Sequence, residues 1–520
     1  MTEDAPPAPG RGAPAPRWWL AVALLAACYG AIIATYASPD ASGSDQSGYL
    51  NSARLIAAGR RFGEVHTPPG LTGEFSPWLV TPLGFAPAPV AGLLAPAYPV
   101  GFPLHLVAGS WVVGWARTGI LVQALAGAAF FVLIVGLGRE LGLPLGWSTA
   151  SAAIVAAFPV SVHFFTWMMS DGLAATWCTA AVLCAVLARR RVAFAAAAGF
   201  AFGVAVLVRP TDVLLLPALA FALPGRWRAW LRFAAAGVPA AVFLVAWNVE
   251  VYGRLLGTGY GDLGRFFAVS YFWPRVAHFL VWLGRLLGPP VLLLWLGSVA
   301  RAVRGERRHL VLLLWFVPMV VFYAFYFYSN EAWWYLRFIL PVVPGLVLGA
   351  ALFAHELVGA AYRRFSGRLA RVTTAAAAVT VLIVALACCH HYNQELRVTR
   401  IARGTADYPR SIAWAESRLP DRAPVLCMQV SGAMFYYSER PFLRWDLMAP
   451  EEFARARDAA RSAGAELYAL LFEIEVEKFL ARAPGAWEQV GWHGRASLWR
   501  PRGEAPPPPA PASRSLTGDI

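Results

Sequence analysis

Long apolar runs separated by short polar breaks make up most of this 520-residue chain. A helix needs about 20 consecutive apolar residues to cross the ~30 Å of hydrocarbon in a bilayer. Runs near that length predict about eleven membrane-spanning helices, at residues 17–37, 118–138, 146–162, 171–188, 192–208, 211–224, 231–250, 277–298, 309–328, 336–357 and 370–390. The run at 211–224 is short, which leaves a tilted or partial span open.

A further apolar stretch, residues 90–114, competes with this scheme. Pro96, Pro99 and Pro103 interrupt it, and proline breaks the hydrogen bonding of a helix interior. A span there would also reverse the orientation of every later loop. We therefore expect a broken helix lying at the membrane interface, within a long first outer loop at residues 38–117.

The pattern changes after residue 390, where short strand-like and helical stretches alternate. This alternation predicts a small α/β domain at residues 391–503. Its expected elements are a helix at 404–419, a buried strand at 425–430, a helix from Pro450 that Gly464 ends, a strand at 466–472, a helix to about 481, and strands near 487–490 and 497–500. Proline-rich composition predicts disordered tails at 1–16 and 504–520, which leaves 17–390 as the transmembrane domain.

Composition agrees with this organisation. The chain is 58% hydrophobic and 14% charged, whereas soluble proteins are roughly 45–50% apolar and about 25% charged. This excludes a soluble enzyme, a disordered protein and a fibre. Five of the six cysteines lie in apolar stretches, so no disulfide framework or cysteine metal site is expected. The predicted fold class is a mainly α, polytopic membrane protein with a small C-terminal α/β domain.

Positive charge is concentrated in the polar breaks, and the net charge is +14. Clusters in short breaks are typical of membrane orientation signals and not of nucleic-acid binding. Alternate breaks hold arginines: Arg139; Arg189, Arg190 and Arg191; Arg226, Arg228 and Arg232; Arg301, Arg304, Arg307 and Arg308; and Arg363, Arg364, Arg368 and Arg371. Placing these on the cytoplasmic side puts the N-terminus inside and residues 391–503 outside.

The same orientation gathers ionisable residues from separate helices on the outer face. Such residues near membrane depth are costly unless they are paired or functional. We therefore expect these residues to meet in one pocket at the outer leaflet: Asp45, Asp171, Arg209, Asp212, Glu331 and Arg337.

Six short motifs support a more specific interpretation. The first outer loop carries Ser44-Asp45-Gln46-Ser47-Gly48-Tyr49 and continues to Arg54, consistent with a helix that starts near Asp45. The others are Ala97–Leu104, Gly136–Gly142, Ser170–Ala174, Val208–Thr211 and Leu336–Pro341. In this order they resemble the GT-C glycosyltransferases, in particular the bacterial group related to protein O-mannosyltransferases, aminoarabinose transferases and RgtA/B/C/D-like proteins. The resemblance covers roughly residues 17–390.

The resemblance implies an integral protein of the bacterial inner membrane that transfers a sugar from a polyprenyl-phosphate donor by inverting displacement. The acceptor would be a lipid, a glycan or a protein on the extracytoplasmic face, and membrane lipids would surround the helices. Asp45 matches the family's first-loop aspartate, the candidate base. Arg209 and Arg337 are candidate phosphate partners, since a guanidinium pairs in two places with phosphate oxygens. The resemblance also places Asp171, Glu331 and Tyr49 among the substrate-binding residues. A divalent metal stays open, and no metal ligand is assigned.

Each site residue also has a structural interpretation. Asp45, Asp171 and Asp212 stand where helix caps occur. Arg209 is placed to extend toward the interface from a helix end, and Arg337 to pair with Glu331. The aromatic residues between Trp315 and Tyr335 fit an interfacial belt, with sugar or polyprenyl contact as the alternative. A transporter or flippase, or a non-catalytic scaffold, remain the other classes of function, although no internal repeat typical of transporters is visible.

Overall fold

The computed structural model describes residues 16–66, 76–330, 332–365, 367–421 and 423–502. Residues 1–15 and 503–520, on which the predicted tails fall, lie outside this part of the chain. The chain divides into two compact units. The helical unit comprises residues 1–39, 99–247 and 261–404, and the mixed unit comprises residues 40–98, 248–260 and 405–520.

The helical unit consists of apolar helices joined by short turns. Its helices are α1 (Pro16–Tyr36), α3 (Gly101–Val113), α4 (Thr118–Leu141), α5 (Leu145–Ala157), α6 (Pro159–Thr166), α7 (Ser170–Leu187), α8 (Phe194–Val208), α9 (Leu216–Ala222), α10 (Trp227–Tyr252), which continues into the mixed unit, α11 (Phe272–Leu287), α12 (Pro289–Val303), α13 (Arg307–Ala324), α14 (Val343–Arg364), α15 (Arg368–Glu395) and α16 (Val398–Ile401). Two 3-10 helices also belong to this unit, η2 (Pro210–Leu215) and η6 (Trp333–Val342).

Among the described residues, seven helices are long and apolar enough to cross a membrane, or up to nine if two bent pairs each count as one span. The chain is an integral membrane protein. The predicted runs at 192–208 and 211–224 correspond to shorter apolar helices, Phe194–Val208 and Pro210–Ala222. The predicted count of about eleven spans is therefore not confirmed, although each predicted run falls on an apolar helical segment of the described residues.

Two predicted spans are broken in the structure, and the breaks have local causes. The run at 146–162 forms α5 and α6, which meet at an angle of 63° where Pro159 begins a new helix. The run at 277–298 forms parts of α11 and α12, bent by 119°. Gly288 lies between them at φ 86°, a conformation open to glycine, and two prolines begin α12.

Residues 90–114 do not form a helix of spanning length. A short strand, β3 (Leu93–Pro96), is followed by α3, whose 13 residues rise only about 20 Å. The predicted break in this apolar stretch is thus present, between the strand that ends at Pro96 and the helix that begins at Gly101.

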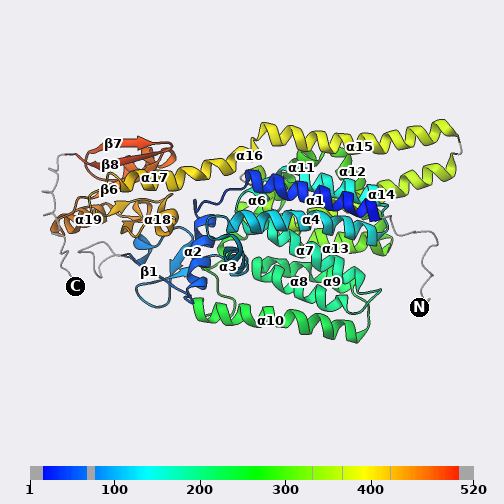
Figure 1. The fold of residues 1–520 in the computed structure, drawn as a ribbon, viewed down its shortest axis with the longest axis horizontal. Coiled ribbons are helices and arrows are strands. Elements are labelled where there is room, and N and C mark those ends of the chain that lie inside the picture. The colour runs from blue at the N-terminus through cyan, green and yellow to red at the C-terminus, as the bar shows by residue number, and fades with distance from the viewer. Residues whose placement is uncertain (1–15, 67–75, 331, 366, 422, 503–520) are drawn as a thin grey trace, which may run out of the picture. The chain divides into compact units, whose positions relative to one another are not determined.

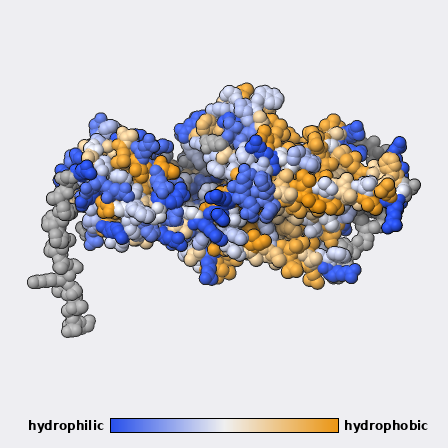
Figure 2. Space-filling view, turned by 90° about the horizontal axis from the view of Figure 1, so that it is seen from above, coloured by the Kyte–Doolittle hydropathy of each residue, from blue (hydrophilic) through white to orange (hydrophobic). Residues whose placement is uncertain are grey.

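Helix α7 lies at the centre of the helical unit. It packs against α4 and α8, and α4 packs against α1 (Figure 1). Of the apolar window in α7, 67% is buried, whereas only 11% is buried in α10 and in the stretch that contains α15. Figure 2 shows a mostly hydrophobic surface over the lengths of the apolar helices and hydrophilic residues at their ends. This is the surface expected of helices that contact lipid.

The arginine-rich breaks gather at one end of the helical unit. Arg189 donates to the carbonyls of Ala222 and Leu223, and Arg190 pairs with Glu140. At the same end Arg307 donates to the Phe221 carbonyl and Arg308 to the Leu141 carbonyl. Successive helices therefore run antiparallel, as the alternation of the arginine clusters predicted. The membrane side on which this end lies remains a prediction.

The mixed unit contains two sheets. Strands β1 (Gly63–Glu64), β3 and β2 (Phe85–Pro87) form a small antiparallel sheet beside helix α2 (Asp45–Ala57). The larger sheet has the order β5-β4-β6-β8-β7, parallel for its first three strands and antiparallel for the last two. Its elements are β4 (Val425–Leu426), β5 (Phe442–Leu443), β6 (Tyr468–Phe472), β7 (Trp487–His493), β8 (Ala496–Pro501), α17 (Asp407–Glu416), α18 (Ser431–Tyr437), α19 (Pro450–Ser462) and α20 (Glu473–Arg482).

Most elements predicted after residue 400 are present, with one correction. The strand predicted at 425–430 ends at Leu426, and helix α18 begins five residues later. A short apolar run fits a buried strand and a buried helix equally well, because periodicity cannot separate them. Strand β5 was not predicted, since its two residues are too short for any periodicity.

Candidate functional site

Three residues from separate elements of the helical unit meet around one carboxylate oxygen. Arg209 Nη1 donates to Asp171 Oδ1 at 2.5 Å, and Arg337 Nε donates to the same oxygen at 3.1 Å. Arg209 Nη1 also lies 3.3 Å from the Arg337 carbonyl oxygen. The Asp171 side chain is fully buried, whereas the side chains of Arg209 and Arg337 are 11% and 19% exposed. We call this group the arginine pair.

Local sequence explains why these side chains converge. Asp171 lies in the first turn of α7, where the helix dipole favours a negative charge. Pro210 follows Arg209 and helps to end α8, so the arginine takes an extended conformation at the helix terminus. Arg337 lies in η6, which packs against α7. The convergence of Asp171, Arg209 and Arg337 is therefore confirmed. The interpretation of Asp171 as a helix cap is wrong, because Met169 occupies the N-cap position of α7 and Asp171 lies inside the helix.

Two further residues extend this group: Tyr323, from the predicted aromatic run, and Thr211. Arg209 Nη2 donates to the Tyr323 hydroxyl at 3.2 Å, and that hydroxyl donates to Thr211 Oγ1 at 2.9 Å. Tyr323 lies 114 residues after Arg209. No local pattern could have joined them, although Thr211 belongs to a motif noted for the resemblance.

Asp212 is fully buried and lies beside the thiol of Cys178. Arg209 occupies the N-cap position of η2 and Asp212 lies inside it, so the cap interpretation is wrong for this residue too. Glu331, the expected partner of Arg337, lies outside the described residues, and its pairing stays a prediction.

Aromatic rings form a row beside the arginine pair. Phe338 lies under both guanidinium groups, 5.7 Å from Arg209 and 5.6 Å from Arg337, measured from ring centroid to guanidinium carbon. Stacked rings continue on either side of it, in Tyr323, Tyr335 and Tyr328. Tyr323 is buried and Tyr328 half-buried. The aromatic run is thus packed ring on ring near the arginines; whether it serves as a belt or contacts substrate stays a prediction.

The second candidate centre lies in the mixed unit, at the start of α2. Asp45 is half-buried, and its Oδ1 accepts a hydrogen bond of 2.5 Å from the Tyr98 hydroxyl. Ser44 Oγ lies 2.7 Å from the same hydroxyl. The Tyr98 ring packs against those of Tyr49 and Tyr260, with centroids 4.8 and 5.8 Å away. Tyr49 therefore supports Tyr98 through ring packing.

Burial raises the pKa of Tyr98 well above its usual value, and the charge of Asp45 raises it further. The phenol therefore stays protonated near neutral pH and donates a hydrogen bond to the carboxylate. Sequence reasoning included Tyr98 in a motif but gave it no role, because its partner lies 53 residues earlier in the chain.

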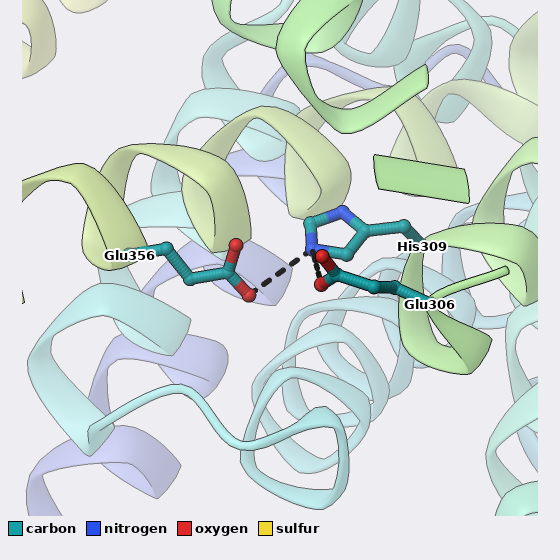
Figure 3. Close-up of side chains that lie close together, drawn as sticks. All are labelled: Glu306, His309 and Glu356. Atoms are coloured by element: carbon teal, nitrogen blue, oxygen red, sulfur yellow. Dashed lines mark hydrogen bonds and ion pairs between the residues drawn. The ribbon is translucent and has the colours of Figure 1, made fainter. Parts of the chain in front are cut away.

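One group of described residues, Glu306, His309 and Glu356, places three metal-ligand atoms within 4.8 Å of one another (Figure 3). His309 Nε2 lies 3.1 Å from Glu356 Oε1, and its Nδ1 lies 2.8 Å from Ser298 Oγ. Arginines already engage both carboxylates: Arg301 pairs with Glu306 at 2.8 Å, and Arg308 with Glu356 at 3.2 Å.

This group lies at the arginine-rich end of the helical unit. It fits an ion-pair network that joins α12, α13 and α14 better than a metal site, since the two carboxylate charges are balanced by two guanidinium groups. One helix of 18 residues, about 27 Å long, separates this end from the arginine pair. The group therefore offers no ligand to chemistry at Arg209.

Comparison with solved structures shows the fold. The structure of ArnT from Cupriavidus metallidurans bound to undecaprenyl phosphate aligns with a TM-score of 0.54 and 14% identity, over 93% of this chain and 98% of that one. The apo state of the same protein aligns with a TM-score of 0.53 and 17% identity, over 92% of this chain and 97% of that one.

An oligosaccharyltransferase from Archaeoglobus fulgidus, in complex with zinc and sulfate, aligns with a TM-score of 0.52 and 12% identity, over 92% of this chain and 72% of that one. No family model and no curated protein matches the sequence. The chain thus has the fold that ArnT and the archaeal oligosaccharyltransferase share, as the GT-C resemblance predicted. At these identities the likeness concerns the fold alone.

Proposed function

We propose that this protein is a membrane glycosyltransferase. It transfers a sugar from a polyprenyl-phosphate carrier to a hydroxyl of a lipid, glycan or protein acceptor on the extracytoplasmic face of a bacterial inner membrane. The observation that carries the proposal is the arginine pair, in which one buried carboxylate holds two guanidinium groups at one end of a lipid-facing helical unit.

The arginine pair suits a phosphate at a membrane surface. Two guanidinium groups close together repel each other, and the buried charge of Asp171 offsets that repulsion. Arg337, the more exposed of the two, presents planar donors that match phosphate oxygens. Asp171 thus acts by positioning the arginines and does not need to touch the acceptor. A structural neighbour bound to undecaprenyl phosphate supports this class of ligand.

The proposed reaction is an inverting displacement at the anomeric carbon. The acceptor oxygen forms a bond to that carbon while the bond to the phosphate oxygen breaks. The acceptor proton passes to Asp45, and polyprenyl phosphate leaves with the bonding electron pair, its charge stabilised by the arginine pair. The Tyr98 hydrogen bond orients the Asp45 carboxylate for this role.

Donor binding gives the first test. The purified protein should bind undecaprenyl phosphate, and Arg337→Ala should weaken binding by about 10- to 100-fold, because a charged hydrogen bond contributes roughly 1.5–3 kcal/mol. Arg209→Ala should also weaken it, since Arg209 is the second cation. Arg139→Ala is the matched control, because Arg139 donates to a backbone carbonyl at the other end of the helical unit.

Equal affinity in wild type, Arg209→Ala and Arg337→Ala would remove the arginine pair from donor recognition. A panel of polyprenyl-phosphate sugars, each tested with and without EDTA, would then identify the sugar and the metal requirement. Product formed from none of the donors would contradict the proposed activity.

A further inference from the structure

Helix α18, from the C-terminal part of the chain, packs directly against α2, which carries Asp45. Nine of the thirteen residues of α2 are buried. Asn51 is one of them, 4% exposed, and its Nδ2 donates to the carbonyl of Gly432 in α18 at 2.9 Å. A buried side-chain amide thus ties the two helices together across 381 residues of sequence.

The approach of the two helices is too close for a side chain at position 432. A Cβ atom there would overlap Ser47 Oγ of α2 and the backbone oxygen of Leu83. The neighbouring Ser431 accepts a hydrogen bond from the Leu83 backbone N–H at 3.1 Å. The N-terminal turn of α18 therefore fits against both α2 and the segment before β2.

The C-terminal end of α18 contacts α2 through the Arg54 guanidinium. The Arg54 guanidinium lies 3.5 Å from the centre of the Tyr436 ring and donates to the Tyr436 carbonyl at 2.9 Å. Next to it, the Tyr437 hydroxyl accepts from the Ala41 N–H at 2.9 Å, close to the start of α2. Three successive contacts thus fix both the position and the rotation of α2.

The larger sheet in turn fixes α18. Glu475 is 1% exposed, and its carboxylate accepts from the backbone N–H groups of Gln429 and Phe472 and from the Trp445 indole. These bonds hold the segment between β4 and α18 against the start of α20. The position of α18 is therefore set by the core of the sheet and not by α2 alone.

We propose that α18 is a positioning platform for the candidate base, and that Asn51 and Gly432 are positioning residues for Asp45. This inference rests on the proposed function. Tyr98 orients the carboxylate itself, whereas α18 fixes the helix that carries it. The role of the C-terminal sheet in catalysis is then mechanical: it holds a base in place without contacting substrate.

Asn51→Ala tests this with two readouts. With an undecaprenyl-phosphate-linked sugar as donor, kcat should fall about 10- to 100-fold, because a small displacement of a catalytic group has effects of this size. Binding of undecaprenyl phosphate should stay within twofold of wild type, since the arginine pair is unchanged. Amide hydrogen exchange should become faster in α2.

Asn248→Ala is the control for side-chain removal, because it breaks an amide-to-carbonyl bond, exposed and to Leu255, that does not involve α2. Gly432→Ala should repeat the Asn51→Ala pattern, with Gly404→Ala, which faces open space, as its control.

The outcomes separate cleanly. A lower kcat with unchanged donor binding and faster exchange in α2 supports positioning. Wild-type kcat in both Asn51→Ala and Gly432→Ala overturns it, and so does a parallel fall of kcat and donor binding, which indicates general loss of structure. If wild type transfers no sugar, the proposed function fails and with it the catalytic role of α18. Hydrogen exchange then still shows whether α18 holds α2.

Discussion

The position of both arginines in the arginine pair depends on one residue, Asp171. Its carboxylate is completely buried, which would be strongly unfavourable for an isolated charge. Two arginines share its Oδ1, so the burial cost is offset by two charge-assisted hydrogen bonds. The same arrangement holds both guanidinium groups within hydrogen-bonding distance of one oxygen. Asp171 is better understood as the anchor of the arginine pair than as a ligand for an acceptor.

At Asp45 we expect Asp45→Asn to abolish transfer, a loss of about 100-fold or more, because the amide cannot take a proton from the acceptor. Expression and undecaprenyl phosphate binding should stay near wild type. Tyr98→Phe should be milder, about tenfold, since it removes only the orienting hydrogen bond. Single-turnover transfer measures both effects, with Asp262→Asn, whose carboxylate only accepts from a loop amide, as control. Normal turnover by Asp45→Asn would exclude Asp45 as the base.

The sequence could predict three of the residues that meet in the arginine pair. Topology brought Asp171, Arg209 and Arg337 together, because the start of α7 and the end of α8 lie at the same end of the helical unit, where η6 packs against α7. It could not predict Tyr323 or the bond from Tyr98 to Asp45. Those contacts depend on how distant segments pack, and neither residue follows a local pattern that encodes its partner.

At the scale of elements, sequence predicted where helices are apolar better than where they bend. The break at Pro159 and the turn at Gly288 lie inside continuous apolar runs, so hydropathy alone reads each run as one span. Helix α18 shows the opposite difficulty. Its seven residues carry too little periodicity to be recognised, yet its contacts with α2 make it one of the more consequential elements.

The hydrogen bonds that link α17 to the segment before β5 should weaken at acid pH. Glu416 at the end of α17 accepts hydrogen bonds from Arg440 and Ser438. Burial raises the pKa of this carboxyl, but those hydrogen bonds and the Arg440 charge outweigh it and bring the pKa below its ordinary 4.5. Because the pKa of this carboxyl is lower in the folded than in the unfolded state, its charged form stabilises the folded state above about pH 4.5. This stabilisation is lost as the pH falls through the lowered pKa.

Glu416→Gln should therefore destabilise the sheet at pH 7 by an amount on the order of 1 kcal/mol, since the pair is partly exposed. The difference from wild type should shrink as the pH is lowered toward the folded pKa. Amide exchange in β4 and β5, compared between variant and wild type at each pH, measures this. Glu477→Gln changes an exposed carboxylate on α20 and should show no such trend. A pH-independent difference would contradict the assignment.

At the scale of the whole chain, charge is segregated between the two ends of the helical unit. Arginine-rich breaks and the network of Glu306, His309 and Glu356 lie at one end, and the arginine pair lies at the other. The positive-inside rule assigns the first end to the cytoplasm. Polyprenyl-phosphate chemistry at the second end would then face the opposite side. This assignment is independent of the family resemblance, because it uses only the arginine positions and the helix order.

Two matched cysteine variants test this orientation, in a Cys28→Ser background that removes the exposed native thiol. Gly225 lies in the arginine-rich break before α10 and Gly404 follows α16; a side chain at either position meets open space. A membrane-impermeant maleimide should label Gly404→Cys in spheroplasts, whereas Gly225→Cys should react only after permeabilisation. The reverse pattern would place the arginine pair on the cytoplasmic side and rule out an extracytoplasmic acceptor. Labelling of both in spheroplasts would contradict the alternation of loops, since an odd number of crossings must separate positions on opposite faces.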